Sequence, residues 1–171
     1  ALIALVGLRV WQLSSQSAPA ELGAGANDRQ RVRHVIDGDT LELNDGTRVR
    51  LIGVDSPETK FSRRSDGKDQ PLARDAMEFA RRAVEGRGVR LQLDNEREDK
   101  YGRLLAYVWY TGEVGGDELM LNEELIRAGL ATALLRFPYS EPMKRRFREA
   151  QTEAKAAKLG VWSAAVSAGN E

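Results

Sequence analysis

Cysteine is absent from the 171-residue chain, and histidine occurs once, as His34. Without thiols, the chain can form no disulfide, thiolate zinc site or cysteine nucleophile. The single histidine also excludes a multi-histidine zinc site and any mechanism that needs two histidines. A metal site in this protein must therefore be built mainly from oxygen ligands, which favour calcium, magnesium or manganese.

A surplus of positive charge is also missing, because 26 basic side chains balance 26 acidic ones. Proteins that coat nucleic acid usually carry a basic surplus, since phosphate neutralisation dominates their affinity. Aromatic residues make up only 6% of the chain, which offers few platforms for stacking bases. The composition therefore disfavours a tight, non-specific coating protein, but it is compatible with an enzyme that contacts a few phosphates.

The first 30 residues differ in composition from the rest of the chain. Residues 1–10 are almost wholly apolar, and Ala18-Pro19-Ala20 has the small-x-small form of a signal-peptidase site. The apolar run is shorter than the roughly 20 residues that span a bilayer, although Trp11 follows it as at the interfacial end of an anchor. We expect export to the periplasm or the medium, with membrane association through this segment as one outcome; a disordered extension is the alternative.

Patterns typical of short strands begin at residue 31. Apolar alternation predicts a half-buried strand that includes His34, and a glycine between Asp37 and Asp39 predicts a bend or bulge at its end. Asn-Asp-Gly-Thr predicts a hairpin turn, after which the partner strand returns. The predicted strands cover residues 31–36, 41–43, 48–54, 89–93 and 105–110.

Three segments have helical patterns. Pro71 opens the first as a first-turn proline, the second covers 117–128, and the third covers 140–159 with Ser140 as its N-cap. Strands of period two with an inserted helix predict an α+β fold, namely a five-stranded OB-fold β-barrel with about three helices packed against it. The chain is thus divided into a segment over 1–30, a domain over 31–162 and a C-terminal tail over 163–171.

Four charged side chains lie at the same end of the predicted hairpin, namely Asp39, Arg50, Asp55 and Glu58. Each alone is more often structural than functional, but together they are more specific. Carboxylates can hold a hard cation, and an arginine can grip two phosphate oxygens. Strict alternation would place Arg50 and Asp55 on opposite faces, so we expect a bulge near Gly53 or a departure from the strand. The combination points to hydrolysis of a phosphodiester.

Several motifs in one order resemble the staphylococcal nuclease (thermonuclease) family. They are IDGDT at 36–40, RLIGVDSPET at 50–59, DKYGRLLAYV at 99–108, LNEELIRAGLA at 121–131 and LGVW at 159–162. The resemblance extends from about residue 31 to 162. It implies a calcium-dependent nuclease that cleaves DNA and RNA, prefers single-stranded or unwound substrate, and cuts the 5′ O–P bond to leave 3′-phosphate products.

The resemblance also implies which residues bind the metal and handle water. Asp39 and Asp55 match calcium-binding carboxylates, and the main-chain carbonyl of Ser56 matches a third ligand. Glu58 matches the carboxylate that orients or deprotonates the attacking water. The predicted cofactor is therefore Ca²⁺.

The substrate contacts follow from the same resemblance. Arg50 and Arg103 match the two arginines that clamp the scissile phosphate, while Lys100 and Tyr101 match residues near a terminal phosphate of the bound nucleotide. Leu135 and Phe137 stand where the family has an aromatic pair near the bound base, so one ring is missing. The expected partners are DNA and RNA substrates, and we expect a monomer.

The main alternative is a catalytically weak nucleic-acid-binding OB-fold module. Such a domain would carry substitutions among the acids and arginines that match catalytic residues. None of these positions is substituted in this chain, which favours the enzyme.

Overall fold

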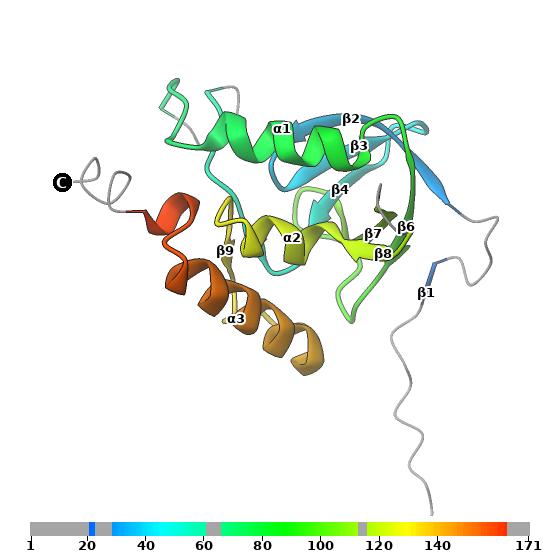
Figure 1. Ribbon diagram of the computed structural model, residues 1–171. Helices are drawn as coiled ribbons and strands as arrows, with labels where there is room; N and C mark the ends of the chain where they lie inside the picture. The colour runs from blue at the N-terminus through cyan, green and yellow to red at the C-terminus, as the bar shows by residue number, and fades with distance from the viewer. Residues whose placement is uncertain (1–20, 23–28, 61–65, 113–115, 164–171) are drawn as a thin grey trace, which may run out of the picture.

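A closed barrel of five strands forms the centre of the computed structural model, which describes residues 21–22, 29–60, 66–112 and 116–163. The strands follow the order β6-β2-β3-β4-β7, and pairing of β6 with β7 closes the barrel (Figure 1). Only the β4–β7 pair is parallel among these five strands. The predicted OB-type barrel is confirmed. Its strands are β2 (Gln30–Asp37), β3 (Thr40–Leu43), β4 (Arg48–Leu51), β6 (Gly88–Gln92) and β7 (Leu104–Thr111).

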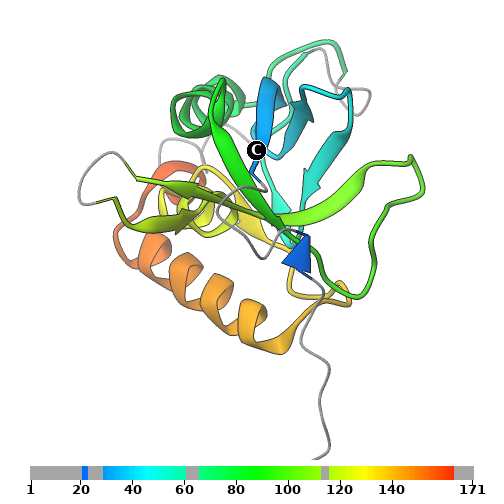
Figure 2. The same ribbon diagram turned by 90° about the vertical axis from the view of Figure 1, so that its right-hand side faces the viewer.

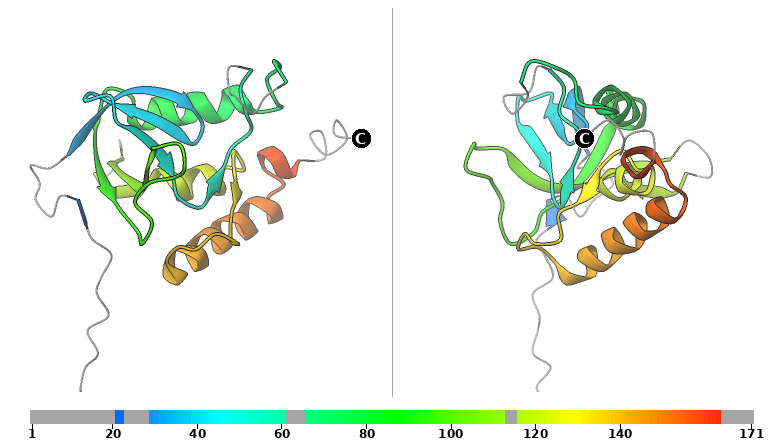
Figure 3. Two further views of the ribbon diagram at one scale, coloured as in Figure 1. Left: turned by 180° about the vertical axis from the view of Figure 1, so that it is seen from behind. Right: turned by 90° about the vertical axis from the view of Figure 1, so that its left-hand side faces the viewer.

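Three α-helices pack against the barrel, as predicted. They are α1 (Ala73–Val84), α2 (Leu121–Arg127) and α3 (Glu141–Ala156), and a short 3-10 helix, η1 (Gly160–Trp162), follows α3. Helix α2 contacts both other helices and strand β7, whereas α1 packs on β2. Figures 2 and 3 show α1 and α3 on opposite sides of α2. Helix α1 begins after Leu72, which adopts a left-handed conformation with φ of 66°.

Four further strands in the described residues are short: two extend the barrel at its edges and two form a separate sheet. Strand β1 (Glu21–Leu22) pairs with β6, and β8 (Glu118–Met120) pairs with β7. Strand β5 (Val54–Asp55) leaves the barrel and pairs with β9 (Thr132–Ala133). The helix predicted over 117–128 is wrong in its first part, because Met120 pairs with Trp109 and is buried in the core before α2 begins.

The core lies inside the barrel and beneath α2 and α3. Asn122 is fully buried there and bonds to three main-chain groups: it donates to the carbonyls of Ile52 and Ala106, and it accepts from the N–H of Val108. A buried amide is stable only when its donors and acceptors are satisfied. Asn122 therefore fixes α2 to the end of β4 and to β7. The apolar residues of this core include Leu41, Leu51, Val89, Leu91, Leu121, Leu125, Ile126 and Phe147.

The alternation predicted for the first strand is wrong beyond Val32. A register shift between residues 32 and 34 lets Val32 and Val35 both lie in the core without exposed surface. His34 is therefore displaced to the outside of β2, where its Nδ1 lies 3.3 Å from Glu85 Oε2. It is a strand residue, as predicted.

The predicted signal or anchor segment, 1–30, lies outside the described residues except for 21–22 and 29–30, and so does the tail beyond Ser163. Within the part of the chain that the structure describes, none of the helices combines the length and the apolar character that a bilayer crossing requires.

Candidate active site

The turn between β2 and β3 holds the first candidate carboxylate. The N–H of Asp39 donates to Asp37 Oδ1 at 3.1 Å, which closes the turn. A Cβ atom at Gly38 would lie 2.7 Å from Ser56 Cβ and 2.8 Å from Ala76 Cβ, so only glycine fits between the segment after β5 and helix α1. As a result, Asp39 is buried and fixed beside Ser56.

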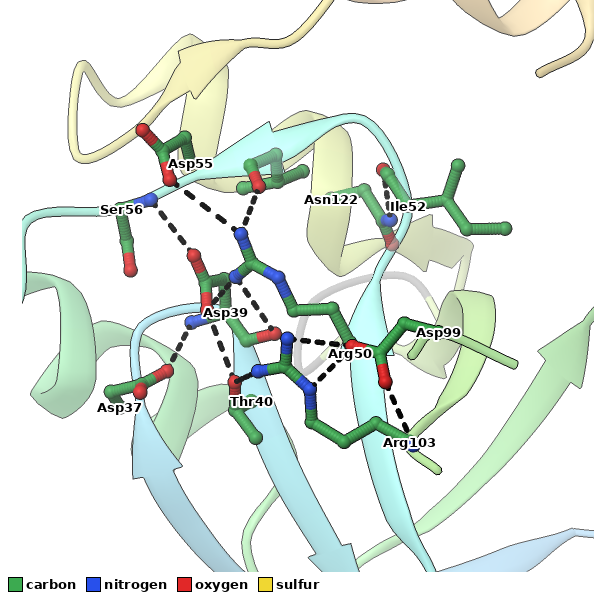
Figure 4. A network of polar contacts seen from close by, with 11 residues as sticks. Asp37, Asp39, Thr40, Arg50, Ile52, Asp55, Ser56, Asp99, Arg103 and Asn122 are labelled. Atoms are coloured by element: carbon green, nitrogen blue, oxygen red, sulfur yellow. Dashed lines mark hydrogen bonds and ion pairs between the residues drawn. The ribbon is translucent and has the colours of Figure 1, made fainter. Parts of the chain in front are cut away.

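Asp55 reaches the same place because the chain departs from the barrel after β4. Gly53 has a φ of 72°, and a Cβ there would meet the rings of Phe147 and Tyr139 at 2.8 Å. This left-handed residue directs β5 towards β9, away from the barrel. The expected departure near Gly53 is confirmed, since Asp55 Oδ1 then lies 3.6 Å from the guanidinium of Arg50 (Figure 4).

The guanidinium of Arg50 lies between the two carboxylates. It forms an ion pair with Asp39 Oδ1 and donates to the carbonyl of Val54 at 2.9 Å. Only 10% of the Arg50 side chain and 5% of the Asp39 side chain are exposed. A buried charge must be paired, because desolvation is costly. Arg50 is therefore the shared countercharge of Asp39 and Asp55 in this structure.

Asp39 accepts two further hydrogen bonds. The N–H of Ser56 donates to Asp39 Oδ2 at 3.0 Å, and the hydroxyl of Thr40 donates to Oδ1 at 3.1 Å. The structure thus brings Asp39, Asp55 and Ser56 together as the sequence predicted.

The donor set fits a hard divalent cation. The carboxylates of Asp39 and Asp55 already share one cation, the guanidinium of Arg50, and both offer only oxygen ligands. Across the described ranges, no group of three or more histidine, cysteine or acidic side chains is arranged around one point. A metal here would accordingly complete its coordination with main-chain carbonyl groups and water.

Burial also affects Asp37, which precedes this pair. Desolvation raises the pKa of the Asp37 carboxyl above its ordinary value, although the nearby Arg50 guanidinium opposes the shift. Because Asp37 Oδ1 accepts the N–H of Asp39, this carboxyl supports the turn. It stands in the same IDGDT motif, which was the available signal for it in the sequence.

Arg103 approaches the site from the loop that leads into β7. Its Nε and Nη2 atoms each lie 2.7 Å from Asp99 Oδ2, and its Nη1 lies 3.4 Å from the hydroxyl of Thr40. Thr40 in turn donates to Asp39, so Arg103 is linked to this carboxylate through Thr40, whereas Arg50 pairs with it directly (Figure 4). The sequence predicted this convergence, but it did not identify Asp99 and Thr40 as the groups that orient Arg103.

Contacts with Arg103 keep the carboxyl of Asp99 ionised. Burial alone would raise the pKa of the Asp99 carboxyl, but hydrogen bonds from the N–H and guanidinium of Arg103 and from the N–H of Tyr101 hold it below its ordinary value of 3.8. Asp99 thus remains ionised and keeps the guanidinium of Arg103 in place.

Lys100 and Tyr101 lie on the outer edge of the same loop. Tyr101 is 66% exposed, with the Lys100 ammonium 5.0 Å and the Arg103 guanidinium 5.5 Å from its ring centre. Cations at these distances interact with the face of an aromatic ring. The pair predicted to contact a terminal phosphate is therefore adjacent to one arginine of the predicted clamp.

Glu58 lies in the segment that follows β5, three residues after Asp55. It is half-buried, and its main-chain N–H and carbonyl both bond to Gln70, just before α1. Sequence reasoning missed Gln70, because no pattern links a glutamine to a residue twelve positions earlier.

The departure from the family's aromatic pair is visible beside β5. Leu135 packs against the core, whereas Phe137 is 58% exposed. The N–H of Leu134 donates to the carbonyl of Gly53 at 2.9 Å, which holds this turn next to the strand that carries Asp55. One exposed ring, that of Phe137, therefore follows a turn that is bonded to Gly53.

Comparison with known proteins gives consistent matches. The model of the family described as "Staphylococcal nuclease homologue" matches residues 48–164. The thermonuclease of Staphylococcus intermedius is 42% identical over 134 residues, which cover 77% of this chain and 74% of that protein. The thermonuclease of Staphylococcus hyicus is 35% identical over 158 residues, covering 89% and 88%. Endonuclease YncB of Bacillus subtilis is 36% identical over 132 residues, covering 75% and 58%.

Proposed function

Because this chain belongs to the staphylococcal nuclease family and is a phosphodiester hydrolase, we propose that it is a calcium-dependent endonuclease. Its proposed substrates are DNA and RNA, preferably single-stranded or unwound, and the proposed products carry 3′-phosphates. The observation that supports this proposal best is the convergence of two carboxylates and two arginines at one end of the barrel.

The proposed metal ligands are the carboxylates of Asp39 and Asp55 with the main-chain carbonyl of Ser56. When bound, Ca²⁺ would offset negative charge and lower the pKa of a coordinated water. The burial of Asp39 and its bond from the Ser56 N–H support this assignment, since they fix the carboxylate before any cation arrives.

The two arginines are proposed to bind the scissile phosphate. Negative charge moves onto the phosphate oxygens in the transition state, and a planar guanidinium can donate to two oxygens at once. Arg103 is already oriented by Asp99 and Thr40, and Arg50 by the carbonyl of Val54. Both guanidinium groups are therefore held at the site before any substrate arrives.

Glu58 is proposed to orient the attacking water and accept its proton. A carboxylate in this role must lie within hydrogen-bond reach of the water, directly or through a second water. Lys100 and Tyr101 are proposed to bind a neighbouring phosphate, which their exposure beside Arg103 supports.

The proposed organisation is an exported, monomeric domain over 31–162, preceded by a signal or anchor segment and followed by a short tail. The apolar character of residues 1–10 supports export.

The test uses oligonucleotides of one sequence as single-stranded DNA, duplex DNA and RNA. With calcium, we expect faster cleavage of the single strands than of the duplex, and fragments that become substrates for a ligase or polymerase only after their 3′-phosphate is removed. Glu58→Ala should retain substrate binding and lose most cleavage. Binding without cleavage by the wild type would favour a nucleic-acid-binding module instead.

A further inference from the structure

We propose that Gln70 is the positioning residue for Glu58, and that it fixes this acid relative to the turn that carries Asp39. The inference rests on the role proposed above for Glu58. It follows from the contacts that the main chain around Glu58 makes with the residues before helix α1.

Gln70 binds both main-chain polar groups of Glu58. Its side-chain Oε1 accepts the N–H of Glu58 at 2.9 Å, and its own N–H donates to the carbonyl of Glu58, also at 2.9 Å. Residues 56–59 are not part of a helix or strand, so no regular ladder sets the position of Glu58. Two bonds to one residue limit how far its backbone can rotate.

Helix α1 holds Gln70 in turn. The carbonyl of Gln70 accepts the N–H of Ala73, the first residue of the helix, at 3.1 Å. Leu72 lies between them in a left-handed conformation that L-residues with a side chain rarely adopt. Such strain persists only where the surrounding structure maintains it. The entry to α1 is therefore a defined structure that presents Gln70 towards Glu58.

The same end of α1 also contacts the turn that carries Asp39. Ala73 and Ala76 are fully buried, and a Cβ at Gly38 would lie only 2.8 Å from the Cβ of Ala76. One helix thus sets the position of Glu58 through Gln70 and that of Asp39 through close packing. The distance between Glu58 and Asp39 therefore depends on α1, although neither acid lies on that helix.

Asp69 makes a second link between the segment that carries Glu58 and helix α1. Asp69 accepts the N–H of Lys60 at 2.7 Å and binds Nε of Arg74, on α1, at 2.6 Å. These bonds hold the backbone immediately after Glu58 against the start of α1, but neither involves Glu58 itself. The side chain of Gln70 is therefore the group whose removal weakens the hold on Glu58 and leaves these Asp69 bonds in place.

A small displacement of a catalytic group can lower a rate by about 100-fold. Gln70→Met keeps the length of the side chain, removes the acceptor and leaves the main-chain bond intact. Because only one of two bonds is lost, we expect kcat to fall about tenfold, with KM changed less than about twofold. The dissociation constant for calcium should also be unchanged within about twofold, since the metal carboxylates are on other segments.

The experiment is a double-mutant cycle measured on single-stranded DNA with calcium. It compares the wild type, Gln70→Met, Glu58→Ala and the double variant, and it adds Gln70→Glu, whose carboxylate can again accept the N–H of Glu58. Gln92→Met is the matched control, because Gln92 Oε1 accepts the indole N–H of Trp109 on the barrel wall. Calcium affinity is measured by calorimetry, and exchange of the Glu58 amide by NMR.

Gln70→Met should lower kcat in the wild-type background and have no further effect in Glu58→Ala. Gln70→Glu should recover most of the rate, Gln92→Met should match the wild type, and exchange of the Glu58 amide should accelerate in Gln70→Met. An equal loss in both backgrounds, or an unchanged kcat in Gln70→Met, would overturn the inference while the proposed function stands. Absence of cleavage by the wild type would overturn both.

Discussion

Replacing Arg50 by methionine should separate two roles of this side chain, one in stability and one in catalysis. The guanidinium is the partner of Asp39, whose side chain is only 5% exposed, and it also lies near Asp55, whose side chain is 36% exposed. Removing one member of a buried pair leaves an uncompensated charge and costs about 3–5 kcal/mol. The more exposed contact with Asp55 contributes at most about 1 kcal/mol. In chelator, the free energy of unfolding of Arg50→Met should therefore be about 3–5 kcal/mol lower than that of the wild type.

Calcium should reverse much of that loss, because a cation at Asp39 and Asp55 replaces the missing guanidinium. Urea unfolding in chelator and in calcium measures both values. We expect the gain on adding calcium to be at least about 1 kcal/mol larger in Arg50→Met than in the wild type. Cleavage should stay about 10²- to 10³-fold slower even in calcium, because the phosphate loses a charge-stabilising donor.

Arg90→Met is the control for this measurement. Arg90 is paired with Glu118 on the outside of the barrel, where the side chains are 21% and 38% exposed. Its loss should cost about 1 kcal/mol or less and should not depend on calcium. If Arg50→Met were destabilised equally in chelator and in calcium, the account of Arg50 as a countercharge at the metal site would be refuted.

Three further substitutions test other parts of the site. Asp99→Asn should cost about 1–2 kcal/mol at neutral pH and slow cleavage by releasing Arg103. The pKa of Asp99 in the folded protein lies below 3.8, so the ionised carboxylate stabilises the fold above that pH, and this contribution is lost as the pH falls through the folded pKa. The thermal unfolding of Asp99→Asn should therefore depend less on pH below about 4 than that of the wild type. Gly38→Ala should cost about 1–3 kcal/mol, because a Cβ would overlap Ser56 and Ala76, and calorimetry should show weaker calcium binding; an unchanged affinity would contradict the packing argument. Phe137→Ala should weaken substrate binding by about 1–3 kcal/mol, seen as a higher KM with a smaller change in kcat; an unchanged KM would show that the exposed ring does not stack on a base.

The convergence of Asp39, Arg50 and Asp55 could be predicted because local sequence encodes it. The turn at Gly38 and the left-handed Gly53 are short-range features, and they determine where the two carboxylates meet. The barrel was similarly predictable from alternating apolar residues. A bulge in β2 changed the phase of this alternation, which is why Val35 follows Val32 into the core and His34 lies outside.

The supporting contacts could not be predicted in the same way. Asn122 joins α2 to Ile52, and Arg103 meets Thr40, across separations of 70 and 63 residues. Such pairs depend on how the barrel closes rather than on local patterns. The contact of Arg50 with Asp39 has a further physical reason, since a buried carboxylate needs a countercharge and the nearest guanidinium supplies it. Its role at the phosphate stays a prediction.

The central claim, a calcium-dependent nuclease centred on Asp39 and Asp55, is tested most directly by the cleavage rate of heat-denatured DNA as a function of free calcium. The account predicts that the rate rises to saturation, disappears in excess chelator and returns when calcium is restored. Asp39→Asn and Asp55→Asn should each shift the curve to higher calcium. Equal cleavage in chelator, with a flat response to calcium, would contradict the account.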